Sequence, residues 1–256
     1  MKQKKLEFGI KEIEFDTWDE FTSFVNKNLK YRHFIWRGQT DSSWLLEPTL
    51  ERILKKTGKA SYTKIINEHL KRFQYAIRGR RGLNPSHLET ENEWWALGQH
   101  NGLATPLLDW SKSPFVAAFF AFNSSGKSST NKHAIYGISK TSFEWKSNTI
   151  KKDHKGSTRP AIIEFIEPLS DENARLVNQG GLFSRSPAGV DIELWMKTNF
   201  QKDDDKIRMW KLLFSESIRN VILQSLNRMN INYASLFPDI YGASKFVNMD
   251  LEIKNY

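Results

Sequence analysis

The sequence contains no cysteine among its 256 residues, and this absence excludes several kinds of chemistry together. Disulfides, thiol nucleophiles, iron–sulfur clusters and thiolate zinc sites all depend on the sulfur of that side chain. The six histidines show no helical spacing typical of metal ligands, so we predict no metal site. Any chemistry of this chain must therefore use oxygen and nitrogen groups or a bound cofactor.

Long hydrophobic segments are also missing. The longest apolar run, from Pro114 to Phe122, is about half of the roughly 20 residues that span a bilayer. The basic start of the chain, at residues 1–5, is followed by no apolar signal core. Because 39% of the residues are apolar and 13% are aromatic, the chain can bury a substantial core, and we expect a globular cytoplasmic protein.

Common catalytic motifs are absent as well. The chain has no glycine-rich phosphate loop, no dinucleotide-binding glycine motif, no zinc-protease motif and no nucleophile elbow. One short pattern remains, because Glu144-Trp145-Lys146 has the acid-x-Lys spacing that metal-dependent nucleases use after a strand. Asp109 would then supply an upstream metal ligand. A metal-dependent nuclease therefore stays open as an alternative.

The positive charge is concentrated in one segment. The formal net charge is +9, and residues 52–81 contain ten lysines and arginines against one acid, Glu68, whereas the rest of the chain is balanced. Apolar side chains recur at helical spacing from Tyr62 to Ile77, with basic side chains on the opposite face. This pattern favours contact with nucleic acid or another polyanion, although a solvated helix face would show it too. The predicted anion patch comprises Lys64, Lys71, Arg72, Arg78, Arg80 and Arg81.

Helical and extended patterns alternate irregularly, without a repeat or a linker, which predicts a single α+β domain over residues 1–256. We expect short mixed or antiparallel sheets flanked by helices. Asp16 is expected to cap a helix, and Ser113-Pro114 to begin a buried one. Residues 33–36 should form a strand that presents Arg37 and Gly38 at its end, where Gly38 allows close backbone approach. Further core strands are expected at Ala134–Ser139 and Ala161–Ile166.

Two segments of the chain carry a distinctive residue pattern. Residues 34–39 read Phe-Ile-Trp-Arg-Gly-Gln, and residues 99–110 read Gln-His-Asn-Gly-Leu-Ala-Thr-Pro-Leu-Leu-Asp-Trp. They resemble the FRG domain, a bacterial family, in its aromatic-Arg-Gly strand end and its Gln-His-x-Gly-x-x-Thr-Arg-Leu-Leu-Asp-Trp stretch. The similarity continues through Arg175, Gln179 and Gly181 to residues 236–243, and spans residues 15–248. Pro106 stands where the family has arginine, so one anion-binding group is lost.

The FRG resemblance implies little about mechanism, so the chemistry must come from the residues themselves. Arg37 can present a planar fork to a phosphate or a carboxylate. Asp109 would either form a buried ion pair with Arg37 or orient a ligand hydroxyl, and His100 would be either functional or a hydrogen-bonded core residue. Together with Gln99, these groups should converge on one cleft. The candidate catalytic residues are Arg37, His100, Asp109 and Gln179.

Arg37 is followed along the chain by residues 105–111, by the apolar helix expected after them, and by Gln179. This order resembles, more weakly, that of the NAD-binding segments of ADP-ribosyltransferases. The resemblance implies NAD as the ligand, held by Arg37, Gln39, Thr105, Ser111 and Gln179. Gly181 occupies the place of the catalytic glutamate, so transfer would need a substitute such as Asp109, Glu93 or Glu193.

Two further hypotheses follow for the whole protein. The first is an FRG-domain protein with an ADP-ribosyltransferase-like site for NAD or another nucleotide. Such a protein would act as a toxin or phage-defence effector, as the genes found near those of the family in bacterial genomes imply. The second is a non-catalytic module in which the same residues form a buried polar network and the basic helix contacts nucleic acid.

Overall fold

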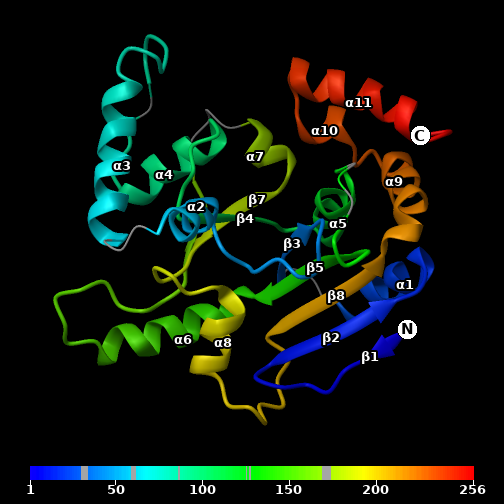
Figure 1. The fold of residues 1–256 in the computed structure, drawn as a ribbon, viewed down its shortest axis with the longest axis horizontal. Coiled ribbons are helices and arrows are strands. Elements are labelled where there is room, and N and C mark those ends of the chain that lie inside the picture. The colour runs from blue at the N-terminus through cyan, green and yellow to red at the C-terminus, as the bar shows by residue number, and fades with distance from the viewer. Residues whose placement is uncertain (30–33, 59–61, 86, 125, 127, 169–173) are drawn as a thin grey trace.

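The fold is built around one eight-stranded mixed sheet with helices on both faces (Figure 1). It was derived as a computed structural model, which describes residues 1–29, 34–58, 62–85, 87–124, 126, 128–168 and 174–256. The strands are β1 (Lys2–Gln3), β2 (Ile10–Phe15), β3 (Phe34–Gln39), β4 (Leu107–Ser111), β5 (Lys132–Ser139), β6 (Glu164–Ile166), β7 (Gly181–Arg185) and β8 (Met209–Ser215). The α+β class expected from the sequence is confirmed, with one large sheet in place of several short ones.

The strand order is β1-β2-β8-β5-β3-β4-β7-β6, in which β2 and β8 are parallel and the other neighbours are antiparallel. One junction differs from the rest. β3 pairs with β5 along all six residues, and β4 pairs with β7 along all five, but β3 and β4 share the single pair Trp36 and Ser111. The sheet is therefore split between β3 and β4 beyond that pair.

Two groups of helices cover one face of the sheet. Successive residues of a strand point to opposite faces, and Trp36 of β3 and Leu107 of β4 both point to this one. The larger group is α1 (Trp18–Asn28), α5 (Pro114–Phe122), α9 (Arg219–Arg228), α10 (Tyr233–Leu236) and α11 (Ile240–Glu252). The smaller group is α2 (Thr49–Thr57), α3 (Tyr62–Ala76) and α4 (Glu91–His100). The split between β3 and β4 lies where the two groups meet.

The opposite face is covered mainly by α6 (Lys140–Asp153) and α8 (Ile192–Asn199). Ile35 precedes Trp36 and Leu108 follows Leu107, so both point to this opposite face, where they contribute to a second core. The expected strand from Ala161 is shorter than predicted, since β6 begins at Glu164 and forms the sheet edge. The strand expected at Ala134–Ser139 is confirmed within β5.

Helix starts follow local capping chemistry, with one correction. Ser113 caps α5 by accepting a hydrogen bond from the Val116 N–H, with Pro114 as the first helical residue, as predicted. The prediction of Asp16 as the cap of α1 is wrong. Thr17 has the extended backbone of a capping residue, and its hydroxyl accepts from the Glu20 N–H. Asp16 instead binds the ammonium group of Met1.

The predicted strand at residues 33–36 is longer than expected. Arg37, Gly38 and Gln39 continue β3 rather than following it, because each of them pairs with a residue of β5. His33 lies outside the described residues. Close backbone approach at Gly38 is confirmed, but the partner is a helix: a Cβ atom at this position would lie 2.0 Å from the carbonyl oxygen of Ala117 in α5.

Two short elements complete the chain, α7 (Ala174–Asn178) before β7 and a 3-10 turn at Glu216–Ile218 before α9. Within the described ranges, no helix is both long and apolar enough to cross a bilayer.

Gly38→Ala is expected to destabilise the protein by about 2–3 kcal/mol, because the added methyl group would push α5 away from β3. Urea unfolding measures the change. Gly126→Ala, in an exposed loop with ordinary backbone geometry, is the matched control and should leave the midpoint almost unchanged. Equal midpoints for the two variants would contradict the close packing of α5 on β3.

Candidate functional site

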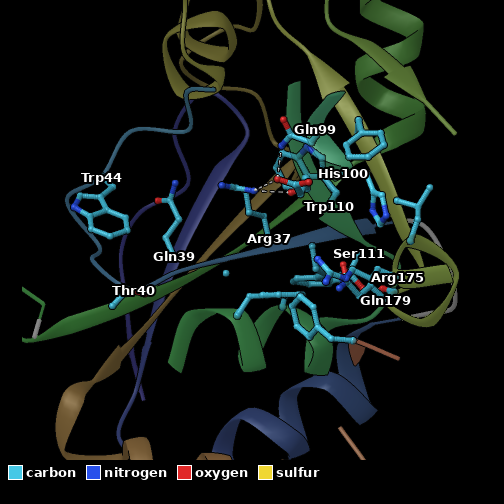
Figure 2. A pocket seen from close by; sticks show the side chains of 18 of the residues that line it. Arg37, Gln39, Thr40, Trp44, Gln99, His100, Trp110, Ser111, Arg175 and Gln179 are labelled. Carbon is cyan, nitrogen blue, oxygen red and sulfur yellow. Dashed lines mark hydrogen bonds and ion pairs between the residues drawn. The ribbon is translucent and has the colours of Figure 1, made fainter. Parts of the chain in front are cut away.

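A cavity of about 380 Å³ lies at the split between β3 and β4 (Figure 2). Residues from both faces of β3 line it, which is possible because, among the described residues, no strand pairs with this edge of β3 beyond Trp36. Most of the candidate residues come together here. The cavity is lined by Arg37, Gln39, Gln99, His100, Asp109, Ser111 and Gln179, among others.

Arg37 bridges the split. Its Nη1 donates a hydrogen bond of 2.8 Å to the backbone carbonyl of Asp109, a residue with which no strand in the described part of the chain pairs from this side. The same nitrogen lies 3.6 Å from Asp109 Oδ2. The Asp109 side chain is 58% exposed, so the expected buried ion pair is not what forms. Burial lowers the pKa of Arg37, the Asp109 carboxylate opposes this effect, and Arg52 adds to it.

A chain of side-chain hydrogen bonds holds Asp109 in place. The Thr105 hydroxyl donates to Gln99 Oε1, and Gln99 Nε2 donates to Asp109 Oδ2 at 2.8 Å. Thr105 is fully buried and does not line the cavity, so its expected direct contact with a cofactor is not supported by its position. Its place is behind Gln99, where it fixes the orientation of the amide.

His100 is the last residue of α4 and lines the cavity without a hydrogen bond to any described residue. Burial lowers its pKa from the usual value, and the nearby charge of Arg175 lowers it further, against the opposing effect of Asp239. The lowered pKa favours the neutral imidazole, which can accept or donate a hydrogen bond. The alternative of a hydrogen-bonded core histidine does not fit this environment.

Ser111 and Gln179 join the far wall of the cavity. The Ser111 hydroxyl donates to the backbone carbonyl of Gln179 at 2.7 Å and accepts from the Ser113 N–H. Gln179 Nε2 donates to the Leu236 carbonyl at 3.1 Å. Both residues thus tie β4 and the segment before β7 to α10, while their side chains border the cavity.

Two arginines of the cavity were not predicted. Arg52 of α2 is one of the ten basic residues in segment 52–81, and nothing in the sequence distinguishes it from the other nine as a cavity residue. Arg175 of α7 belongs to the FRG-like pattern, four residues before Gln179. This spacing is the signal from which its place beside Gln179 could have been predicted. Arg175 pairs with Asp239 and lies over the Phe237 ring, 5.4 Å from its centroid.

A second, shallower hollow of about 680 Å³ adjoins the cavity. Gln99, His100 and Arg175 line both spaces. Asp239 belongs to the outer hollow only. An extended ligand would therefore pass the Arg175 guanidinium on its way from one space to the other.

Only one of three candidate carboxylates reaches the cavity. Asp109 lines it, whereas Glu93 completes the capping box of α4 and Glu193 pairs with Lys211. A glutamate in place of Gly181 would require Leu176 to move, because a Cβ atom there would lie 2.5 Å from Leu176 Cδ1 and 3.1 Å from its carbonyl oxygen. Of these three carboxylates, Asp109 is therefore the one placed to take part in chemistry in the cavity.

The nuclease pattern lies elsewhere. Glu144 and Lys146 are inside α6, not directly after a strand, and Glu144 pairs with Lys140. Glu144 borders a different hollow from Asp109. Across the described part of the chain, no three histidine or acidic side chains are grouped as a metal site would require.

The basic segment forms an exposed surface on α3 and the turn after it, at the outer edge of the molecule (Figure 1). Ile66 and Leu70 are buried against α4, as the helical spacing predicts. Lys64, Lys71, Arg72, Arg78 and Arg80 are exposed. Arg81 differs from these, since it is half-buried and its guanidinium lies over the Trp94 ring at 5.6 Å.

Residues 32–130 match the family model of the FRG domain. The chain contains an FRG domain. The match spans β3, α2 to α5 and β4, and it includes both of the segments that suggested the resemblance. It ends before Arg175 and Gln179, which complete the cavity from outside the matched residues. No curated protein and no solved structure gives a significant match.

The FRG domain here has Pro106 in the place of the family arginine. Pro106 is buried and does not line the cavity. The cationic groups that line the cavity come instead from Arg37 and Arg52 within the FRG domain, and from Arg175 beyond it.

Glu51, the neighbour of Arg52 on α2, is buried. Glu51 is 5% exposed, and its Oε2 accepts a 3.1 Å hydrogen bond from the Gly189 N–H, which fastens α2 to the segment before α8. Burial raises the pKa of Glu51 to about 7, although the hydrogen bond from Gly189 opposes this shift. Glu51 is therefore partly protonated at neutral pH.

This raised pKa predicts a pH-dependent stability. Between the unfolded value and about 7 the folded state holds a proton that the unfolded state has lost, so the free energy of unfolding falls as pH rises. Glu51→Gln should remove about 1–3 kcal/mol of this fall between pH 5 and pH 8. Urea unfolding at four pH values measures it, with exposed Glu68→Gln as control. Parallel curves for wild type and Glu51→Gln would show that Glu51 does not titrate in this range.

Proposed function

We propose that the cavity between β3 and β4 binds a nucleotide with a phosphate group, and that NAD is the leading candidate. The observation that carries the proposal is the lining: Arg37, Arg52 and Arg175 border one space with a single acid, Asp109, and with aromatic rings. Arginine forks match phosphate oxygens, and aromatic rings match a nucleobase. A space of about 380 Å³ that continues into a second hollow suits an extended ligand.

The electrostatics of Arg37 support an anionic ligand. The Arg37 side chain is mostly buried, with 19% of its surface exposed, and this burial together with the charge of Arg52 disfavours its protonated form. Its Nε atom is buried and has no hydrogen-bond partner among the described residues. A phosphate between Arg37 and Arg52 would relieve their repulsion and provide acceptors for the unused donors.

For the reaction, we propose ADP-ribosyl transfer from NAD. The bond between the ribose C1′ and nicotinamide would break, with its electron pair leaving on nicotinamide, while an acceptor nucleophile bonds to C1′ and releases its proton. Asp109 would hold the ribose side and stabilise the positive charge that develops there. Its Oδ1 accepts no hydrogen bond from the described residues, and Gln99 fixes Oδ2.

A biological role as a toxin or phage-defence effector belongs to the same proposal. It is supported by the FRG resemblance alone. Transfer of ADP-ribose to a cellular target would be the means by which such an effector acts.

Binding is tested by a thermal-shift titration with NAD, ADP-ribose and ATP on wild type and Arg37→Lys. Ligand at about 100 times its Kd should add about 2.7 kcal/mol and raise the Tm by about 5–10 °C. Arg37→Lys keeps the charge but loses the planar fork, so the shift should largely disappear. Exposed Arg228→Lys is the matched control and should keep it.

The opposite result has a definite meaning. If no nucleotide shifts the wild-type Tm while the protein still retards nucleic acid at low salt, the nucleotide proposal fails. The exposed cations of α3 then carry the function as a polyanion-binding surface.

The reaction is tested by release of nicotinamide from NAD. Asp109→Asn keeps the size of the side chain but removes its charge, so the rate should fall by about 100-fold or more while the NAD-induced thermal shift remains. Exposed Asp153→Asn should behave as wild type. Full activity of Asp109→Asn, or no nicotinamide release by wild type with a range of acceptors, would overturn transferase activity and leave nucleotide binding.

A further inference from the structure

One end of the cavity carries a buried acceptor without a partner. Gln39 is 5% exposed and lines the cavity, and its Nε2 donates a 3.1 Å hydrogen bond to the backbone carbonyl of Leu45. Because that carbonyl can only accept, the amide orientation is fixed and Oε1 is the free atom. No described residue donates to Oε1. An unpaired buried acceptor is unfavourable and is rare in folded proteins.

An exposed indole stands beside this acceptor. Trp44 lines the same cavity and is 49% exposed, and Figure 2 shows it at the Gln39 end, away from His100 and Arg175. A large aromatic side chain with half its surface in water is available for stacking with a planar ring.

The loop that carries Trp44 is held firmly. The Asp41 carboxylate is 2% exposed, and it accepts hydrogen bonds from Ser43 and Ser129. Burial by itself would raise the pKa of Asp41, but these hydrogen bonds hold it well below its usual range. The Asp41 carbonyl also accepts from the Trp44 N–H. The backbone at Trp44 is thus fixed, whereas about half of its side-chain surface is exposed to solvent.

We infer that Gln39 and Trp44 form a ring-recognition end of the cavity. The ligand has a planar ring that stacks on the Trp44 indole and bears an N–H group that donates to Gln39 Oε1. Since Oε1 is sealed from solvent, the side chains that cover it must move as the ring enters. The anionic part of the ligand then lies toward Arg37, two residues before Gln39 on the same side of β3.

This inference rests on the proposed nucleotide site and narrows its ligand. An adenine amino group and a nicotinamide carboxamide both present the required N–H on a planar ring. A hypoxanthine ring or a nicotinic acid ring replaces that group with oxygen, which would face Gln39 Oε1 as a second acceptor. The site should therefore reject the oxygen analogue of whichever ring it binds.

Isothermal titration of four mononucleotides tests this inference and separates the two sources. AMP is compared with IMP, and nicotinamide mononucleotide with nicotinic acid mononucleotide, on wild type, Gln39→Leu and Trp44→Ala. Wild type should bind the amino member of at least one pair about tenfold more tightly or better. Gln39→Leu should reduce that ratio to near one.

Trp44→Ala should weaken the preferred mononucleotide by about 5- to 100-fold, because stacking is lost. Trp44 is 49% exposed, so this variant should fold normally. Trp145→Ala on α6, where the tryptophan is 61% exposed, is the control. The Tm of each variant without ligand, compared with that of wild type, shows whether the variant is folded.

The outcomes distinguish this inference from the function on which it rests. If NAD shifts the Tm through Arg37 but both pairs bind without discrimination, or Trp44→Ala keeps full affinity, the ring-recognition end is wrong and nucleotide binding stands. If no mononucleotide binds and NAD gives no shift, both proposals fail together. A preference for AMP places adenine at Gln39, and a preference for nicotinamide mononucleotide places the carboxamide there.

Discussion

The packing of α5 directly on β3 is the constraint on which the site depends. Gly38 leaves room for the backbone of α5 at Ala117 and Ala121, so helix and strand meet without an intervening side chain. Along one edge of β3, β5 pairs with the full length of the strand. β3 is therefore held by a helix on one face and a strand on one edge, and the remaining edge is free to border a cavity. A side chain at position 38 would loosen the first of these contacts and with it the position of Arg37 and Gln39.

The free edge of β3 explains why the cavity wall is polar. In a continuous sheet the carbonyl of Asp109 would pair with a neighbouring strand, and a buried carbonyl without a partner is unfavourable. Arg37 supplies the missing donor. The same guanidinium retains further donors that face the cavity, so its structural and binding roles do not compete. Thr105 and Gln99 extend this arrangement by fixing the Asp109 carboxylate from behind.

Local signals predicted much of the fold, and tertiary contacts account for what they missed. Ser113 and Pro114 mark the start of α5 by capping chemistry that the sequence alone expresses. The segment that forms α6 has no clear amphipathic pattern in the sequence, because its contact with the core is narrow. Phe143 is buried, and the Ser147 hydroxyl bonds both the N–H and the carbonyl of Ile163. These two hydrogen bonds join residues that are sixteen positions apart, so the residue pattern around Ser147 or around Ile163 does not predict them.

The same distinction applies to the candidate site. The motif segments identified Arg37, Gln39, His100 and Asp109, because these residues lie on two strands and a helix end that meet at one split. Thr105 belongs to the same stretch, but its side chain is buried behind the wall, and a motif does not reveal which face a residue takes after a bend. Arg52 and Arg175 reach the cavity from α2 and α7, whose positions are set by packing between distant segments.

The two glutamines on either side of Arg37 allow an internal comparison. Gln99 has both amide atoms paired, its oxygen with Thr105 and its nitrogen with Asp109, so the fold can satisfy a glutamine at this cavity. Gln39 is more deeply placed and yet pairs only its nitrogen. A wall that served structure alone would gain stability by pairing both atoms or by replacing the amide with an apolar side chain of similar shape. An acceptor kept unpaired in such a wall is better explained by a partner that arrives from the cavity than by packing.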